Sequence, residues 1–146
     1  MQVAIGSDHG GFHLKEEVKQ LLAEMNIPYR DFGTYSLNSV DYPDIAEVVT
    51  RAVANGEYDR GILLCGTGIG MSIAANKIKG IRAALVHDVF SAIATREHND
   101  SNVLCMGERV VGSGLARLIA RTWLETSFIG ERHAERVKKI GQLEGC

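Results

Sequence analysis

Proline, cysteine and long apolar runs are scarce in this sequence of 146 residues, which contains two prolines and three cysteines. No stretch approaches the roughly 18 apolar residues of a membrane span, and the first residues lack the basic start and apolar run of a signal peptide. The odd number of cysteines and the absence of a Cys-x-x-Cys pair argue against a disulfide framework and a zinc knuckle. We therefore expect a cytoplasmic protein with free thiols and no membrane partner.

Charge of one sign is not in excess either. The chain has 16 Lys and Arg against 18 Asp and Glu, a net charge of −2. Binding to nucleic acid without sequence preference needs a cationic surface, so we expect no nucleic-acid partner. The apolar fraction of 45% and the charged fraction of 23% are ordinary for a globular protein. The length predicts one domain, residues 1–146, with a core that needs no disulfides.

Short apolar runs alternate with longer amphipathic segments. We predict strands at 2–7, 29–32, 60–65, 81–86 and 102–106, and helices at 12–25, 42–54 (with Asp41 as N-cap), 71–79, 89–97, 113–126 and 131–143. This alternation predicts an α/β protein, a Rossmann-like three-layer α/β/α sandwich with a five-stranded parallel sheet. The strand order stays open. In the order 2-1-3-4-5, the loops after the first and third strands meet in one crevice.

Glycine, in contrast, is abundant, and three alternating glycines follow the third predicted strand in the run Cys65-Gly66-Thr67-Gly68-Ile69-Gly70. Such a loop exposes backbone N–H groups toward a bound oxygen or phosphate, helped by the following helix N-terminus. It could be a dinucleotide site with Asp88 as the ribose-binding acid, but the spacing is G-x-G-x-G rather than G-x-G-x-x-G. A thiolate at Cys65 could act as a base or a nucleophile. The plain alternative is a buried cysteine at the end of a strand.

Three further groups of polar residues could belong to a site. Asp8 and His9 precede two glycines at the end of the first strand, where Asp8 could instead cap a helix. His98 and Asn99 lie at the end of a helix. They could act as a general acid and a hydrogen-bond donor, or they could simply form a polar turn. Arg132 and Arg136 share one helix face, where they could bind an anion together or could simply be solvated charges. Arg109 follows the last strand.

These groups suggest an enzyme rather than a passive binding protein. A small anionic substrate, a thiolate base and a cradle for an oxyanion fit proton transfer next to a carbonyl, as in sugar-phosphate isomerisation. No His spacing typical of a metal site is present, so we expect neither a metal nor a cofactor. The alternatives from other classes are a nucleotide-binding regulatory module and an interaction protein with an inert pocket.

Four segments together resemble the ribose/galactose-6-phosphate isomerase family, and in particular its type B ribose-5-phosphate isomerases. The segments are VAIGSDHGGF at 3–12, VDYPD at 40–44, GILLCGTGIGMSIAANK at 61–77 and REHNDSNVLCMGER at 96–109. The resemblance spans essentially the whole chain. It implies interconversion of D-ribose 5-phosphate and D-ribulose 5-phosphate in the pentose phosphate pathway, through an enediolate and without metal or cofactor. It also implies a homodimer, in some members a dimer of dimers, with an active site shared across the interface.

The resemblance also implies roles for single residues. Cys65 resembles the base that moves the proton between C2 and C1, and His98 the acid that opens the sugar ring, with Asp8 and Thr67 as assistants. The N–H groups of Gly66, Thr67, Gly68, Ile69 and Gly70 resemble the enediolate cradle. Asn99 resembles a ligand of the sugar oxygens, and the remaining residues resemble phosphate or substrate ligands: His9, Arg132, Arg136 and Arg109, the last of them supplied by the partner subunit. The helix at 131–143 would complete the phosphate site.

The family leaves two points open. Some members carry Ser at the cysteine position and a Glu base in the next helix. Here position 65 is Cys and the segment 71–79 contains no Glu, so the cysteine branch is the better match. The sugar could also be allose, allose 6-phosphate or galactose 6-phosphate.

Overall fold

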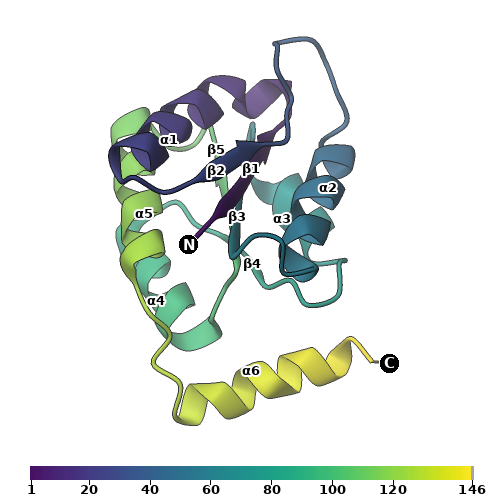
Figure 1. The fold of residues 1–146 in the computed structure, drawn as a ribbon, viewed down its shortest axis with the longest axis vertical. Coiled ribbons are helices and arrows are strands. Elements are labelled where there is room, and N and C mark those ends of the chain that lie inside the picture. Colours follow the sequence, from purple (N-terminus) through teal and green to yellow (C-terminus); the bar gives the residue numbers. More distant parts are fainter. Residues whose placement is uncertain (146) are drawn as a thin grey trace.

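The computed structural model describes residues 1–145, which form one parallel sheet between layers of helices (Figure 1). The strands are β1 (Val3–Ser7), β2 (Tyr29–Asp31), β3 (Arg60–Cys65), β4 (Ala83–Leu85) and β5 (Val103–Gly107). All neighbouring strands run parallel, in the order β2-β1-β3-β5-β4. The predicted five-stranded α/β architecture is confirmed.

The strand order, which the sequence left open, differs from 2-1-3-4-5 at one end of the sheet, because β5 lies between β3 and β4. Every residue of β5 is buried, whereas β4 is three residues long and partly exposed. A continuous apolar strand suits the centre of a sheet covered on both faces, and a short strand suits its edge. β1 and β3 are still neighbours, so the loops that follow them meet as expected.

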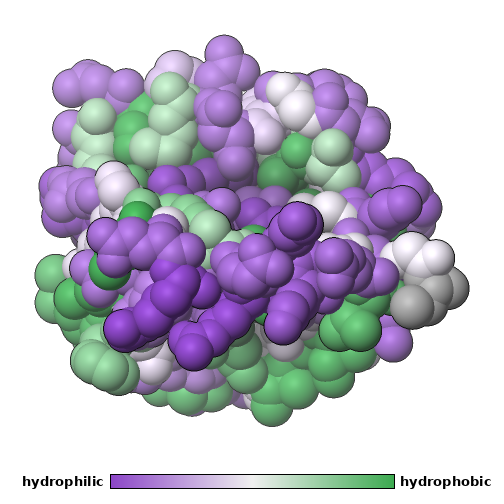
Figure 2. Space-filling model, turned by 90° about the horizontal axis from the view of Figure 1, so that it is seen from below, coloured by the Kyte–Doolittle hydropathy of each residue, from purple (hydrophilic) through white to green (hydrophobic). Residues whose placement is uncertain are grey.

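Helices cover both faces of the sheet. The face under α1 (Phe12–Glu24), α4 (Val89–Asn99) and α5 (Ser113–Glu125) holds one apolar cluster, and the face under α2 (Tyr42–Ala54) and α3 (Ile69–Ala75) holds the other (Figure 1). α6 (Arg132–Leu143) packs on α4, below the edge at which the strands begin. From below, hydrophilic side chains form a band across the molecule where α6 runs (Figure 2). No helix within residues 1–145 is long and apolar enough to cross a membrane.

Two details of the helices differ from the prediction. α3 begins and ends earlier than 71–79, because Gly68 adopts φ 77° before its first turn and Asn76 ends it. The Asn76 side chain accepts a hydrogen bond from the Ala83 N–H at 2.8 Å, which joins the helix end to β4. Asp41 occupies the N-cap position of α2 as predicted, but its side chain makes no capping hydrogen bond.

A fully buried lysine joins α1 to the end of β2. Lys15 Nζ donates to both carboxylate oxygens of Asp31, at 2.8 and 2.9 Å, and Lys19 Nζ also bonds Asp31 at 2.9 Å. Burial alone would raise the pKa of Asp31, but the hydrogen bonds from Lys15 and Lys19 hold this pKa below its usual value of 3.8. The charged carboxylate is therefore stabilised by folding.

Asp31→Asn should lower the free energy of unfolding at neutral pH by on the order of 3 kcal/mol, because it leaves the buried ammonium of Lys15 without its counter-charge. The contribution of a carboxylate with a depressed pKa is complete above its unfolded value and is lost as the pH falls through the folded value. Urea unfolding of both proteins should therefore show a difference that narrows below pH 3.8. A difference that does not change with pH would contradict the ion pair.

Candidate active site

The loops after β1 and β3 lie against each other at the edge where the strands end. Asp8 caps a short 3₁₀ turn, η1 (His9–Gly11), by accepting from the N–H groups of Gly10 and Gly11 at 2.9 and 3.2 Å. A Cβ on Gly10 would lie 3.2 Å from the nitrogen of Gly66, and one on Gly11 only 2.5 Å from the Leu64 carbonyl carbon. Glycine is therefore required for this close approach of two backbones.

A cavity of about 460 Å³ opens between these loops. Residues from four parts of the chain line it, among them Asp8, His9, Tyr42, Cys65, Thr67 and Arg109. The cavity therefore brings together the predicted residues of the first loop, the glycine loop and the segment after β5. The expected role of Asp8 as a helix cap is also present, and it uses Oδ1 of the carboxylate.

Cys65 is the last residue of β3 and is 5% exposed. The N–H of Gly68 donates to its Sγ at 3.0 Å. The sulfur therefore contacts the backbone of the glycine loop directly. Cys105 lies in the middle of β5, and burial followed by the proximity of Cys65 raises the pKa of its thiol. Cys105 therefore stays protonated at neutral pH.

The glycine loop presents backbone donors to the cavity. Within residues 1–145 the N–H groups of Gly66 and Thr67 have no acceptor, whereas the Ile69 N–H donates to Thr67 Oγ1 at 3.3 Å. The Thr67 side chain is exposed toward the opening. A Cβ on Gly68 would lie 2.8 Å from the Met106 carbonyl carbon, and one on Gly107 would lie 2.4 Å from that of Thr67. The loop is thus packed tightly on β5.

Gly68→Ala should lower kcat at least about tenfold, because the methyl group displaces the donors of the loop from the reacting atoms. Gly56→Ala is the matched control. Gly56 has a similar φ of 78° but open space around its Cα, and it follows α2 at the edge where the strands begin. Alanine at a positive φ strains the backbone at both positions, but only at position 68 does its methyl group also displace the loop. Steady-state kinetics of both variants separate these two effects, and equal losses of kcat would show that backbone strain alone lowers the activity.

Two residues that the sequence analysis did not assign to the site support it. Tyr42, the first residue of α2, packs so closely that a Cβ on Gly70 would lie 2.6 Å from its ring. His87 Nε2 accepts from the N–H of Gly107 at 3.0 Å, and burial lowers the pKa of this imidazole despite the nearby Asp88. A neutral His87 is the form that can accept this bond. The motif VDYPD, which contains Tyr42, was a signal for this residue, whereas no motif pointed to His87.

Arg109 lies in the same chain's cavity as Cys65. Its backbone N–H donates to Gly66 O at 3.0 Å, and its side chain lies beside the Cα of Gly66. The adjacent Glu108 N–H donates to Cys65 O at 2.9 Å. Arg109 of the same chain thus lines the cavity, because the segment after β5 is bonded directly to the end of β3. The expectation that a partner subunit supplies an Arg109 stays a prediction.

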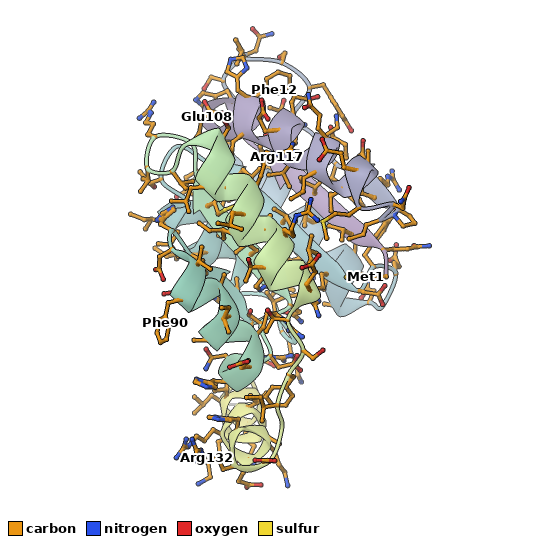
Figure 3. All side chains as sticks on the ribbon, turned by 90° about the vertical axis from the view of Figure 1, so that its left-hand side faces the viewer. Met1, Phe12, Phe90, Glu108, Arg117 and Arg132 are labelled. Atoms are coloured by element: carbon orange, nitrogen blue, oxygen red, sulfur yellow. The ribbon has the colours of Figure 1, made fainter. Side chains whose placement is uncertain are left out.

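The remaining predicted residues lie at the opposite edge of the sheet. α4 runs antiparallel to the strands, so His98 and Asn99 at its C-terminal end return to the edge where the strands begin. Asn99 O accepts from Arg82 Nε at 3.2 Å, just before β4. Figure 3 shows Arg132 at the far end of the molecule from Glu108, which adjoins Arg109. The chain therefore does not bring His98, Asn99, Arg132 or Arg136 to its own Cys65.

These distant residues form a compact group, which we call the basal cluster: His98, Asn99, Arg132, His133 and Arg136. The rings of His98 and His133 stack with centroids 4.3 Å apart, which joins the end of α4 to the start of α6. Desolvation, and then the charges of His98, Arg132 and Arg136, lower the pKa of His133. The Ile129 N–H donates to Glu97 O at 3.2 Å and holds the connection to α6. The basal cluster is thus cationic and ordered.

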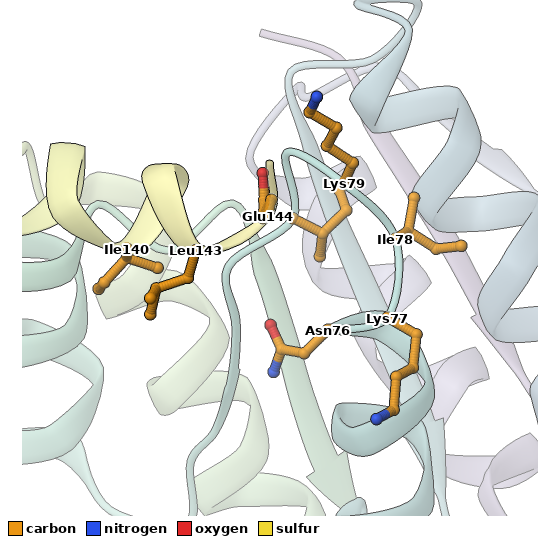
Figure 4. A pocket seen from close by; sticks show the side chains of 8 residues that line it. Asn76, Lys77, Ile78, Lys79, Ile140, Leu143 and Glu144 are labelled. Carbon is orange, nitrogen blue, oxygen red and sulfur yellow. The ribbon is translucent and has the colours of Figure 1, made fainter. Parts of the chain in front are cut away.

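The far end of α6 is bound to the loop after α3. Both carboxylate oxygens of Glu144 accept from the Gly80 N–H at 3.0 Å. Between them lies a cavity of about 470 Å³ lined mainly by aliphatic side chains and lysine stems, including Ile78, Lys79, Ile140 and Leu143 (Figure 4). None of its lining residues is a Cys, Ser, Thr or His, so the candidate active site remains at the Cys65 edge.

The described residues also bear on two other kinds of site, a metal site and a nucleotide site. No group of three or more His, Cys, Asp or Glu able to hold a metal ion occurs within residues 1–145. Asp88, the expected ribose-binding acid of the nucleotide hypothesis, accepts from the Ser91 N–H at 2.7 Å as the cap of α4. It also follows β4, which is not a neighbour of β3 in the sheet, so it does not follow the strand next to the glycine loop's own strand.

Comparison with known proteins places this site in a family. The model for Ribose/Galactose Isomerase matches residues 3–140. The chain belongs to this family. It is 61% identical over 145 residues to a putative sugar phosphate isomerase of Bacillus subtilis, covering 99% of the chain and 97% of the relative. A structure of ribose-5-phosphate isomerase B from Clostridium thermocellum is 54% identical, with a TM-score of 0.98 and coverage of 99% and 98%.

The isomerase family contains more than one activity. A D-erythrulose-4-phosphate isomerase of Pectobacterium atrosepticum is 41% identical over 146 residues, with coverage of 99% of this chain and 95% of the relative. Both named substrates are phosphorylated sugars with a carbonyl group next to a hydroxylated carbon. Membership of the ribose/galactose isomerase family therefore defines the reaction class more firmly than the length of the sugar.

Proposed function

We propose that this chain is an aldose–ketose isomerase that interconverts D-ribose 5-phosphate and D-ribulose 5-phosphate. The observation that carries the proposal is Cys65 Sγ in a cavity beside the N–H groups of Gly66 and Thr67, which have no acceptor among residues 1–145. A base and adjacent oxyanion donors are what proton transfer next to a carbonyl requires. The 54% identical structure is titled as a ribose-5-phosphate isomerase B, which supports this sugar.

In the proposed mechanism, the Cys65 thiolate removes the proton from C2 of the open-chain aldose. The C2–H electron pair forms the C1–C2 double bond, and the C1 carbonyl oxygen becomes the enediolate oxygen. The N–H groups of Gly66 and Thr67 stabilise that oxygen, by about 3 kcal/mol for each contact on the analogy of acyl transfer. The Cys65 thiol then returns the proton to C1. The proton of the C2 hydroxyl passes to the C1 oxygen, so that C2 becomes the ketone and C1 carries the hydroxyl group.

The basal cluster would serve the active site of a second copy. The resemblance assigns ring opening to His98 and sugar or phosphate binding to Asn99, Arg132 and Arg136, yet all four lie at the edge opposite Cys65. A homodimer that places the basal cluster of one protomer over the cavity of the other resolves this separation. Ile69 and Ile73 beside the cavity are 50% and 58% exposed, as expected for apolar side chains that a partner covers.

Arg136→Ala should raise the KM for ribose 5-phosphate about 10- to 100-fold, because it removes a charge-assisted bond to the phosphate. Activity on unphosphorylated ribose should not change. Lys138→Ala is the matched control, since Lys138 is exposed on a different face of α6. If both substrates lost efficiency equally, Arg136 would not be a phosphate ligand.

The test of the proposed function is formation of ribulose 5-phosphate from ribose 5-phosphate with EDTA present and no added cofactor. We expect rapid turnover. D-erythrulose 4-phosphate, allose 6-phosphate and galactose 6-phosphate should be assayed in parallel, and a higher kcat/KM with one of them would replace ribose 5-phosphate in the proposal. Stabilisation by NAD(H) or ATP in a thermal-shift assay, without isomerase activity, would support the nucleotide module instead.

A further inference from the structure

The connection between β2 and α2, residues 32–41, contacts the active-site cavity through His9. The backbone N–H of Val40 donates a hydrogen bond to His9 Nδ1 at 3.2 Å. A backbone N–H can only donate, so Nδ1 must be the acceptor and carries no proton in this arrangement. The proton of the neutral ring is then on Nε2. The hydrogen bond made by one ring nitrogen thus determines the chemistry of the other.

Hydrogen bonds and a close backbone contact fix the turn that carries His9. Asp8 accepts from two N–H groups of the turn, and the Asp8 N–H donates to Leu64 O at 3.3 Å. Gly10 packs against Gly66 of the glycine loop. Because His9 lines the cavity and its Nδ1 is occupied by Val40, Nε2–H is the ring group left for a ligand.

Hydrogen bonds fix the start of the connection, so Val40 does not belong to an unconstrained loop. Ser7 N donates to Gly33 O at 2.7 Å, and Thr34 N donates to Ser7 O at 2.6 Å. The buried Lys15 also donates to Thr34 O, and its ammonium lies 5.2 Å from the centre of the Tyr35 ring. At the other end, Tyr42 begins α2 and lines the cavity.

We propose that the segment 32–41 is a positioning element that fixes His9 with its proton on Nε2, so that His9 binds the substrate as an uncharged N–H donor. The substrate half of this statement rests on the proposed function, a phosphorylated sugar in the Cys65 cavity. Arg109 supplies positive charge from the same chain. A neutral donor beside it adds direction to the binding of an oxygen without a further cation.

The tautomer can be measured in the free protein. Long-range ¹H–¹⁵N correlation spectra at neutral pH distinguish an Nε2–H ring, an Nδ1–H ring and an imidazolium, and the His9→Gln variant assigns the His9 signals by their absence. We expect the Nε2–H tautomer. An Nδ1–H ring or an imidazolium at His9 would overturn the proposal. This measurement needs no substrate, so it is independent of the isomerase activity.

Val40→Pro removes the donor, and Ser39→Pro is its matched control, since the Ser39 N–H makes no hydrogen bond within residues 1–145. Val40→Pro should change the His9 spectrum toward a mixture of tautomers and raise the KM for ribose 5-phosphate about five- to tenfold, with kcat changed less than about twofold. Ser39→Pro should change neither. Equal effects of both variants, or an unchanged His9 spectrum in Val40→Pro, would contradict the positioning role. If Val40→Pro does not fold, the wild-type spectrum still decides.

The two proposals fail in different ways. Absence of sugar-phosphate turnover by the wild-type protein would overturn the proposed function and the substrate half of this inference. The tautomer in the free protein tests the effect of Val40 on His9 separately.

Discussion

Replacing Cys65 by alanine should lower kcat for ribose 5-phosphate about a thousandfold, because general acid–base catalysis by a positioned side chain contributes roughly 10²–10⁴-fold. The loss should appear in kcat and not in KM, since the thiol acts on the reacting carbon and the phosphate is bound elsewhere. The fold should persist, because the change removes one sulfur atom at a strand end and leaves the β3 ladder unchanged.

Cys105→Ala is the matched control for this prediction. Cys105 is as deeply buried and lies on the neighbouring strand, but its raised pKa keeps it a thiol, so its removal should leave kcat near the wild-type value. Exchange of substrate protons with D₂O, followed by NMR, gives a second measurement: Cys65→Ala should not exchange the proton at C2. A Cys65→Ala variant that keeps a tenth of the wild-type kcat or more would require a different base.

The sequence predicts the sheet well because its central strands contain short apolar runs such as ILLC at 62–65, although β2 at the edge is the polar run YRD. It does not predict that β5 inserts between β3 and β4, because the runs at 83–85 and 103–107 are both short and apolar. Their order depends on how completely the helices of both layers cover each strand, which is a tertiary property. The early end of α3 has a local cause, the side chain of Asn76, but Asn also occurs within helices, so the pattern alone does not reveal it.

The candidate site was predictable in part for a similar reason. β1 and β3 are neighbours in both strand orders, so the meeting of Asp8, His9 and Cys65 follows from parallel topology. The position of the basal cluster was also available from the pattern, since a residue at the C-terminal end of a helix lies at the edge where the next strand begins. His98 and Asn99 precede β5 in this way. The hydrogen bond from the Gly107 N–H to His87 Nε2, in contrast, joins two strand ends that no local pattern connects.

The separation of Cys65 from the basal cluster leads to the last prediction, which concerns mixed dimers. Cys65→Ala and His98→Asn should each be nearly inactive as pure proteins. A heterodimer of the two should contain one site with Cys65 from one protomer and His98 from the other, both intact, and a second site with both defects. Equal mixing with free exchange should therefore restore about a quarter of the wild-type activity, because half of the dimers are mixed and each has one working site of two.

The control combines two defects on the same side of the site. Cys65→Ala and Gly68→Ala both alter the cavity edge, so their heterodimer should contain no intact cavity and should be no more active than the Gly68→Ala protein itself. Co-expression with two different affinity tags yields the heterodimers for kinetic measurement, and sedimentation equilibrium reports their mass. Activity restored by His98→Asn but not by Gly68→Ala requires that two chains share each site. A purified Cys65→Ala/His98→Asn heterodimer without activity, or a wild-type protein that sediments as a fully active monomer, would refute the shared site and leave the basal cluster without a catalytic role.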